Sequence, residues 1–206
     1  MAGHAGHRLA GLVRGGGPGA AGARERCATV FVCGLSMGGT LALRLAAEPP
    51  DDVSGLVLVN PGNKMHGAAA RTLPVTRHLI RTAKGIASDI AKPGTPEIGY
   101  GRVPLHAAHS LRRLFQVVDA QLPRVTQPLL LLHSPEDHVV PPVDSARILG
   151  RVSSRDVTER LLERSYHVAT LDYDAQFVFE ETYAFIGRLA PSVAEGAGKE
   201  GTAASG

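Results

Sequence analysis

The sequence is poor in aromatic residues and in cysteine. Its 206 residues include no tryptophan, four tyrosines and five phenylalanines, so a core has to be built mainly from leucine, valine, alanine and isoleucine. Two cysteines are too few for a disulfide scaffold, which favours a reducing, cytoplasmic location over an extracellular one. Cys27 and Cys33 flank one short apolar run, and we interpret both as buried structural thiols rather than as a redox pair.

Long apolar runs and concentrated charge are also missing. No apolar stretch approaches the roughly 18 residues that a membrane-spanning helix requires, so no transmembrane segment is expected. The N-terminus lacks a charged start followed by an apolar segment and therefore does not predict a signal peptide. The net charge is only +3, and the arginines are spread out without a basic run or interleaved aromatic residues. We therefore expect no nucleic-acid partner.

Glycine is concentrated at the start of the chain. The first 26 residues contain a Gly-Gly-Gly-Pro-Gly tract and almost no large apolar residue. Such a segment cannot bury enough surface to offset its ordering entropy, so residues 1–26 are predicted to be disordered. His4 and His7 lie in this segment, and we interpret them as idle rather than as metal ligands. The small and polar residues 191–206 predict a second disordered end, which leaves 27–190 as one folded domain.

Within residues 27–190, short apolar runs alternate with amphipathic segments. The apolar runs predict strands at residues 29–33, 55–60, 128–133 and 157–162, and the first three have the near-continuous hydrophobicity of parallel strands buried on both faces. Segments with helical spacing predict helices at residues 37–47, 143–149 and 174–189. This alternation predicts an α/β fold, a parallel sheet of about four strands flanked by helices.

The strand pattern stops between residues 64 and 125. Residues 71–91 and 105–122 have the apolar spacing of helices, and a turn-rich Pro93-Gly94-Thr95-Pro96 separates them. A helical insertion of this size between two parallel strands favours a cap over the carboxyl edge of the sheet. The alternative is a single elaborate crossover connection.

The most informative motif is Gly34-x-Ser36-x-Gly38, which lies between a predicted strand and a predicted helix. In a nucleophile elbow, a serine occupies a strained angle on a sharp strand-to-helix turn, and glycines flank it because side chains would clash there. The dipole of the following helix favours the negative charge that develops during acyl transfer. The motif therefore predicts a nucleophilic Ser36, and the alternative is a Gly-rich turn with an idle serine.

Two further groups follow predicted strands in the order that this kind of sheet requires. Asp137 lies in the loop after residues 128–133, and His167 lies in the loop after residues 157–162. The carboxyl ends of parallel strands meet at one edge, so Ser36, Asp137 and His167 can converge although they are far apart in sequence. A serine needs a base to become a nucleophile, and an imidazole base needs a carboxylate to orient it.

Each assignment has an alternative. Glu136 is adjacent to Asp137 and could be the acid instead, or Asp137 could be a solvated carboxylate. His138 is a poor candidate for the base because it lies beside the acid rather than opposite the serine, and His167 could be an ordinary loop histidine. Asp172 and Asp174 precede a predicted helix, and we interpret them as a helix start or cap.

With these residues the chain resembles the bacterial carboxylesterase and monoacylglycerol-lipase branch of the α/β-hydrolase family, over residues 27–190. The matching stretches are Gly34-Leu35-Ser36-Met37-Gly38-Gly39, the run from Pro128 to Pro141, Ser165-Tyr166-His167-Val168, and Tyr100-x-x-Val103-Pro104-Leu105. The resemblance implies that Ser36 is the nucleophile, Asp137 the acid and His167 the base. It also implies that the Met37 N–H stabilises the oxyanion, that a small-molecule acyl ester is cleaved through an acyl-enzyme without a cofactor or metal, and that the cap shelters the acyl chain.

The sequence departs from this family ahead of Ser36. In the family, several strands precede the nucleophile strand, and a His-Gly loop after one of them supplies a second oxyanion N–H. Here 26 residues precede that strand region, and Gly3-His4 and Gly6-His7 follow no strand. We therefore expect the run at 29–33 to form an exposed edge and the chain to be a fragment of a longer hydrolase. Rival interpretations are a catalytically impaired fragment, a non-catalytic remnant, or another hydrolase activity such as a thioesterase or peptidase.

Overall fold

The computed structural model describes residues 22–23, 27–48, 53–85, 88–95 and 101–190. The segments predicted to be disordered, 1–26 and 191–206, lie outside these residues, except that residues 22–23 are described as helical. No helix in the described ranges is both long enough and apolar enough to cross a membrane.

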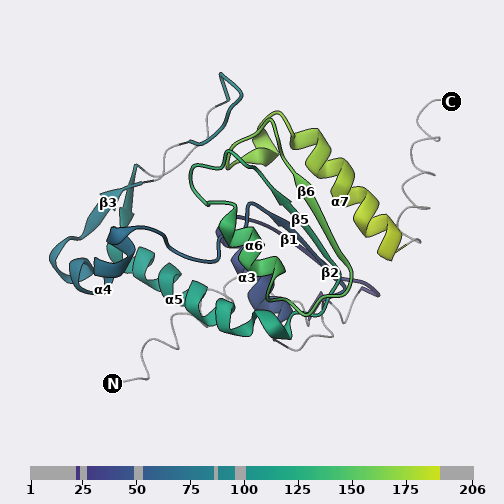
Figure 1. The fold of residues 1–206 in the computed structure, drawn as a ribbon, viewed down its shortest axis with the longest axis horizontal. Helices are drawn as coiled ribbons and strands as arrows, with labels where there is room; N and C mark the ends of the chain where they lie inside the picture. The colour runs from purple at the N-terminus through teal and green to yellow at the C-terminus, as the bar shows by residue number, and fades with distance from the viewer. Residues whose placement is uncertain (1–21, 24–26, 49–52, 86–87, 96–100, 191–206) are drawn as a thin grey trace.

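The centre of the molecule is a parallel sheet of four strands in the order β1-β2-β5-β6 (Figure 1). The strands are β1 (Phe31–Leu35), β2 (Gly55–Val59), β5 (Leu129–His133) and β6 (Val157–Leu161). Leu35 pairs with Val59, and Val59 pairs with Leu132, so the carboxyl ends of β1, β2 and β5 lie at one edge. The predicted α/β fold, with about four parallel strands flanked by helices, is confirmed.

Helices cover both faces of this sheet (Figure 1). One face carries α3 (Met37–Ala46), α5 (Leu105–Gln121) and α6 (Val143–Leu149), and the other carries α7 (Ala175–Leu189). Two short 3-10 helices are η2 (Leu122–Arg124) and η3 (Ala169–Leu171). Side chains alternate along β2: Leu56 and Leu58 belong to the core cluster on the α3 face, whereas Val57 and Val59 belong to the cluster on the α7 face. Because both faces are covered, every residue of β2 and β5 is buried, as their continuous hydrophobicity indicates.

Strand β1 differs from this pattern and corrects two predictions. It begins two residues later than expected, and among the described strands it pairs with β2 alone, so it is an edge as expected. Its residues are half-buried, and Cys33 is exposed, because no described strand covers its outer side. The prediction that this strand is buried on both faces is therefore wrong. Cys27 is exposed as well, and the two cysteines are free thiols rather than buried ones.

The chain between β2 and β5 forms an insertion at one end of the molecule (Figure 1). It contains α4 (Ala68–Leu79), an antiparallel pair of short strands, β3 (Thr82–Lys84) and β4 (Arg102–Pro104), and then α5. The helix predicted at 105–122 is confirmed as α5. The helix predicted at 71–91 is wrong beyond Leu79, because Ile80 has extended backbone (φ −119°, ψ 125°) and residues 82–84 pair with residues 102–104.

Candidate active site

Ser36 occupies a strained turn between β1 and α3. Its φ of 54° and ψ of −118° lie where residues other than glycine are seldom found. The surrounding backbone fixes this conformation: the Ser36 N–H donates to the Val59 carbonyl at 2.9 Å, and the Gly39 N–H donates to the Ser36 carbonyl at 3.0 Å. Strained residues persist only where their neighbours over-determine them, and they concentrate at functional sites.

The glycines around Ser36 have unequal roles. A Cβ atom on Gly34 would lie 2.3 Å from both the carbonyl carbon and the oxygen of Gly38, a distance that no fold tolerates. A Cβ on Gly39 would lie 2.9 Å from the Cβ of Pro61. A Cβ on Gly38 would meet nothing within 4 Å. The expectation that side chains on both motif glycines would clash is therefore right for Gly34 and wrong for Gly38.

Asp137 and His167 are in direct contact. The Asp137 Oδ2 atom lies 2.7 Å from the His167 Nδ1 atom, and the Asp137 side chain is fully buried. The Asp137 Oδ1 atom accepts the backbone N–H groups of Val139 at 2.8 Å and Val140 at 2.7 Å, which fix the carboxylate. Glu136, the alternative acid, is exposed, and its backbone N–H donates to Ser134 Oγ.

Asn60 joins the strand ends to the loop that carries His167. It is fully buried at the end of β2, with a φ of 46°. Its Nδ2 atom donates to the carbonyl of His167 at 2.7 Å, and its Oδ1 atom accepts the Ser134 N–H at 2.8 Å. The preceding residue, Val59, accepts the Ser36 N–H, so the three sequence-predicted residues are tied to one edge of the sheet. Sequence reasoning missed Asn60, although a polar residue directly after a buried strand was a usable signal.

Asp89 connects the insertion to the same edge. Its Oδ1 atom lies 2.8 Å from His138 Nδ1, and its Oδ2 atom accepts the His167 N–H at 3.1 Å. The Val168 N–H donates to the Asp89 carbonyl at 3.1 Å. His138 also packs edge-on against Tyr166, with ring centroids 4.6 Å apart. His138 therefore contacts the insertion rather than Asp137. No local sequence pattern around Asp89 predicts these contacts.

Met37 is the first residue of α3. The first N–H groups of a helix have no intrahelical acceptor, and Gly39 and Thr40 turn theirs back to the Ser36 carbonyl. No described residue accepts a hydrogen bond from the Met37 N–H. This donor therefore lies directly beside Ser36, at the positive end of the helix dipole.

Asp172 and Asp174 fix the loop around His167. Asp172 accepts the backbone N–H groups of Ala91, Lys92, Tyr166 and Tyr173 at 2.7 to 3.0 Å. Burial raises the pKa of Asp172, but these four donors together outweigh it and hold the pKa below its usual value. Asp174 precedes α7 and accepts the Arg164 N–H at 2.9 Å instead of capping the helix with its side chain. Asp174 therefore stands at the start of α7, as predicted, but the prediction of a cap is wrong, because neither side chain caps the helix.

A second buried histidine lies beside the carboxylate. His133 ends β5 and is 2% exposed, its Nδ1 atom is 2.5 Å from Ser145 Oγ, and its Nε2 atom is 3.1 Å from the Val140 carbonyl oxygen. A carbonyl can only accept, so Nε2 carries a proton, and in the neutral ring Nδ1 then accepts the Ser145 hydroxyl. Burial lowers the pKa of His133. The contact with the Val140 carbonyl and the charge of Asp137, whose Oδ2 atom is 3.8 Å away, raise the pKa, but burial has the larger effect.

We expect this neutral histidine to make folding stability depend on pH. Its pKa is lowered on folding, so below the unfolded value of about 6.5 the unfolded chain binds the extra proton and the stability contribution is lost as pH falls. His133→Gln keeps a donor and an acceptor but does not titrate. Urea unfolding at pH 7.5, 6.5 and 5.5 measures the effect, and the wild type should lose about 1 kcal/mol per pH unit more than the variant on the acidic side. If the free energy of unfolding fell equally with pH in the wild type and in His133→Gln, His133 would not be the group responsible.

Among the described residues, no group of three or more histidine, cysteine, aspartate or glutamate side chains is arranged to hold a metal ion. The chemistry available at the sheet edge is that of a serine in a strained turn, an imidazole oriented by a buried carboxylate and a free backbone donor. That set of groups is suited to acyl transfer through a covalent serine intermediate.

Comparison with known proteins places this chain in a family. The sequence matches the hydrolase family described as serine aminopeptidase, S33, over residues 19–95 and 91–174. It is 39% identical over 167 residues to a thermostable monoacylglycerol lipase of Bacillus sp. (strain H-257), and the aligned region covers 81% of this chain and 66% of the relative. It is 26% identical over 171 residues to a monoacylglycerol lipase of Mycolicibacterium smegmatis, covering 76% of this chain and 61% of the relative.

Solved structures agree with the sequence comparison. A chain from the structural work on LipS and LipT, two metagenome-derived lipolytic enzymes, superimposes with a TM-score of 0.81 at 34% identity, covering 89% of this chain and 74% of that chain. The monoacylglycerol lipase of Paleococcus ferrophilus has the same fold, with a TM-score of 0.68 at 17% identity, covering 89% and 75%. The chain spans 51% to 66% of the length of the curated relatives it matches. It belongs to the serine aminopeptidase S33 family of α/β-hydrolases.

Proposed function

We propose that this chain hydrolyses carboxylic esters through an acyl-enzyme on Ser36, with monoacylglycerols as the substrate class. The observation that carries the proposal is the 2.7 Å contact between Asp137 and His167, at the sheet edge where Ser36 is held with a φ of 54°. The substrate class rests on the relatives that are monoacylglycerol lipases.

In the proposed reaction, His167 Nε2 removes the proton of Ser36 Oγ as the oxygen attacks the ester carbonyl carbon. Asp137 stays ionised, holds the proton on Nδ1 and stabilises the imidazolium that forms. The Met37 N–H donates to the oxyanion of the tetrahedral intermediate. His167 then gives its proton to the departing alcohol. Water attacks the resulting acyl-enzyme with His167 again as base, and the fatty acid is released with Ser36 restored.

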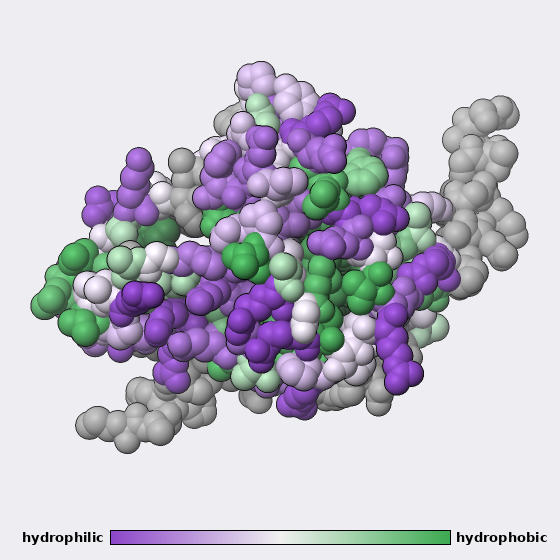
Figure 2. Space-filling model, in the orientation of Figure 1, coloured by the Kyte–Doolittle hydropathy of each residue, from purple (hydrophilic) through white to green (hydrophobic). Residues whose placement is uncertain are grey.

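We assign residues 64–125 the role of a cap within the 27–190 domain. Asp89 supports this role, because it reaches from the insertion to His138 and to the His167 backbone. Hydrophobic side chains gather on the α4 end of the molecule (Figure 2). There Val75, Leu79 and Ile80 are 65%, 80% and 53% exposed. Apolar surface on the insertion supports a cap that handles an acyl chain.

We also propose that the protein works in a reducing compartment such as the cytoplasm. Cys27 and Cys33 are free and exposed, and exposed thiols persist unoxidised mainly where thiols are kept reduced.

A second candidate activity is cleavage of aminoacyl amides, because the matching family is described as serine aminopeptidase. Ser36, Asp137 and His167 could cleave either an ester or an amide, so a panel of substrates is needed to distinguish the two activities. We would compare monoacylglycerols of short, medium and long acyl chain with aminoacyl nitroanilides and an acyl thioester, using Ser36→Ala as the control. The proposal predicts ester turnover that disappears in the control. Faster cleavage of the amides, or ester turnover that survives in Ser36→Ala, would contradict it.

A further inference from the structure

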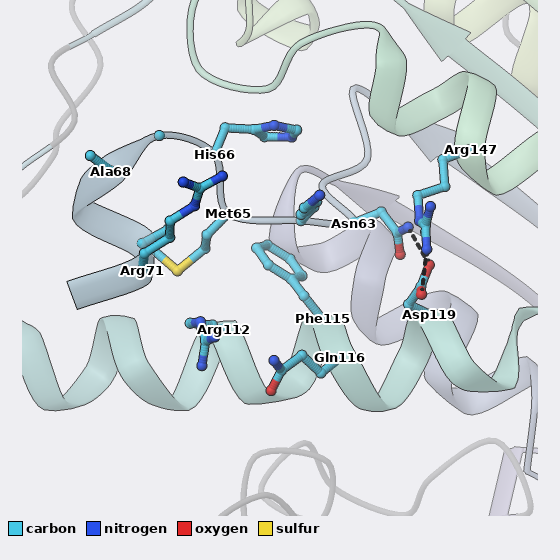
Figure 3. Close-up of a pocket in the computed structure, with 13 residues that line it drawn as sticks. Asn63, Met65, His66, Ala68, Arg71, Arg112, Phe115, Gln116, Asp119 and Arg147 are labelled. Atoms are coloured by element: carbon cyan, nitrogen blue, oxygen red, sulfur yellow. Dashed lines mark hydrogen bonds and ion pairs between the residues drawn. The ribbon is translucent and has the colours of Figure 1, made fainter. Parts of the chain in front are cut away.

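A hollow of about 590 Å³ lies beside the loop that follows β2, and none of its lining residues is Ser36, Asp137 or His167. The walls come from residues 63–68, from α4, from α5 and from Arg147 of α6 (Figure 3). Its size is that of a small-molecule site. Its lining is unusually rich in cationic side chains, which include Lys64, Arg71, Arg112 and Arg147.

The two carboxylates next to this pocket, Asp119 and Asp144, each accept several hydrogen bonds. Asp119 accepts Arg147 Nε at 2.6 Å and Nη2 at 2.7 Å, and it also accepts Asn63 Nδ2 at 3.1 Å. The hydrogen bond from Arg147 holds the pKa of Asp119 below its usual value. Asp144, which is 1% exposed, accepts the N–H groups of Asn63 and Lys64 and contacts His66 at 2.6 Å. Asp119 is thus paired with Arg147, whereas Asp144 is hydrogen-bonded to backbone N–H groups and His66, and neither forms an ion pair with Lys64, Arg71 or Arg112.

Three cations of the lining have no direct ion-pair partner among the described residues: Lys64 and Arg71 are exposed, and Arg112 is half-buried. Within the described part of the chain, Lys64, Arg71 and Arg112 form no ion pair, in contrast to Arg147. The neighbourhood is electropositive: burial lowers the pKa of His109, one turn before Arg112 on α5, and charges that include Arg112 lower it further. Arg112 is half-buried, so less water than usual screens its charge.

The two uncompensated arginines come from different helices. Arg71 extends from α4 toward His66, Arg112 lies on α5 at the opposite side of the space, and Met65 lies between them (Figure 3). Phe115 also borders the space. Guanidinium groups recognise phosphate and carboxylate oxygens in a bidentate manner. The apolar atoms of Met65 and Phe115 suit the carbon part of an organic anion. A plain acyl chain fits this lining poorly, because it would desolvate the arginines without pairing them.

We infer that this pocket is a second ligand site, separate from Ser36, that binds the phosphate or carboxylate group of a small organic anion between Arg71 and Arg112. The inference rests on the charges of the pocket and does not depend on the proposed esterase activity.

Isothermal titration tests it with two probes, inorganic phosphate and octanoate, on the full chain carrying Ser36→Ala so that turnover cannot contribute. Arg112→Gln and Arg71→Gln should each weaken binding of the preferred probe about tenfold or more, because each removes a charge-assisted hydrogen bond. Arg113→Gln is the matched control: Arg113 is the next residue of α5, is exposed, and does not line the pocket. It should leave the Kd unchanged.

The two probes also distinguish a phosphorylated ligand from an apolar carboxylate. Tighter binding of phosphate favours a phosphorylated ligand, and tighter binding of octanoate favours an apolar carboxylate. Absence of binding for both probes would overturn the inference, as would equal weakening by Arg113→Gln and Arg112→Gln. Thermal unfolding of each variant shows that it is folded. Arg112→Lys, which retains the charge, should keep more of the affinity than Arg112→Gln.

Discussion

Asp137→Asn is expected to lower the rate of ester hydrolysis about 10⁴-fold while the chain remains folded. The asparagine oxygen can still accept the N–H groups of Val139 and Val140, as Asp137 Oδ1 does. Its amide nitrogen takes the place of Oδ2 and donates to His167 Nδ1, so the imidazole proton moves to Nε2. A histidine protonated at Nε2 cannot accept the proton of Ser36.

Steady-state kinetics on a monoacylglycerol or a chromogenic ester measures this loss, with unfolding by urea recorded in parallel. Glu136→Gln is the control, because Glu136 is exposed and forms no contact with His167. It should retain the wild-type rate. A rate for Asp137→Asn within tenfold of the wild type, or an equal loss in Glu136→Gln, would show that Asp137 is not the orienting acid.

Gly34→Ala is expected to destabilise the fold by about 3 kcal/mol or more. Its Cβ would lie 2.3 Å from the Gly38 carbonyl group, which is backbone and cannot rotate away, so β1 and α3 would have to separate. Urea unfolding measures the effect. Ser36 would also lose its position, because Gly39 and Thr40 hold its carbonyl through the same turn.

Gly38→Ala is the matched control for that substitution. A Cβ on Gly38 meets nothing within 4 Å, and alanine is the better helix former by about 1 kcal/mol. We expect Gly38→Ala to be at least as stable as the wild type. Wild-type stability in Gly34→Ala would mean that the turn around Ser36 is not sterically fixed.

Much of the fold could be predicted because it is encoded locally. The helix predicted at 143–149 is α6, and the apolar run at 128–133 contains β5, because a change of hydrophobic period within a short window is enough to reveal each. The end of α4 at Leu79 could not be found in this way, because β3 forms only by pairing with β4 across the insertion. The exposure of Cys33 depends on which strands flank β1, which no local pattern records.

In the candidate site, too, locally encoded features could be predicted and features that depend on distant contacts could not. Ser36, Asp137 and His167 were located from the motif, the strand ends and the family resemblance, and the structure brings Asp137 and His167 into contact. Their catalytic roles remain proposals. Asp89 and His133 were missed because their contacts depend on how the insertion and α6 fold back on the sheet, and those arrangements involve residues far apart in sequence.

Labelling by a fluorophosphonate probe tests most directly whether Ser36 is an activated nucleophile. The probe reacts with a serine whose hydroxyl is activated by a base, and it needs no knowledge of the natural substrate. We expect the folded chain to be labelled at Ser36, as located by mass spectrometry of the labelled peptide, with labelling abolished in Ser36→Ala and strongly reduced in His167→Ala. A folded chain that is not labelled, or that is labelled at another serine, would contradict the proposal that these three residues form a working catalytic site.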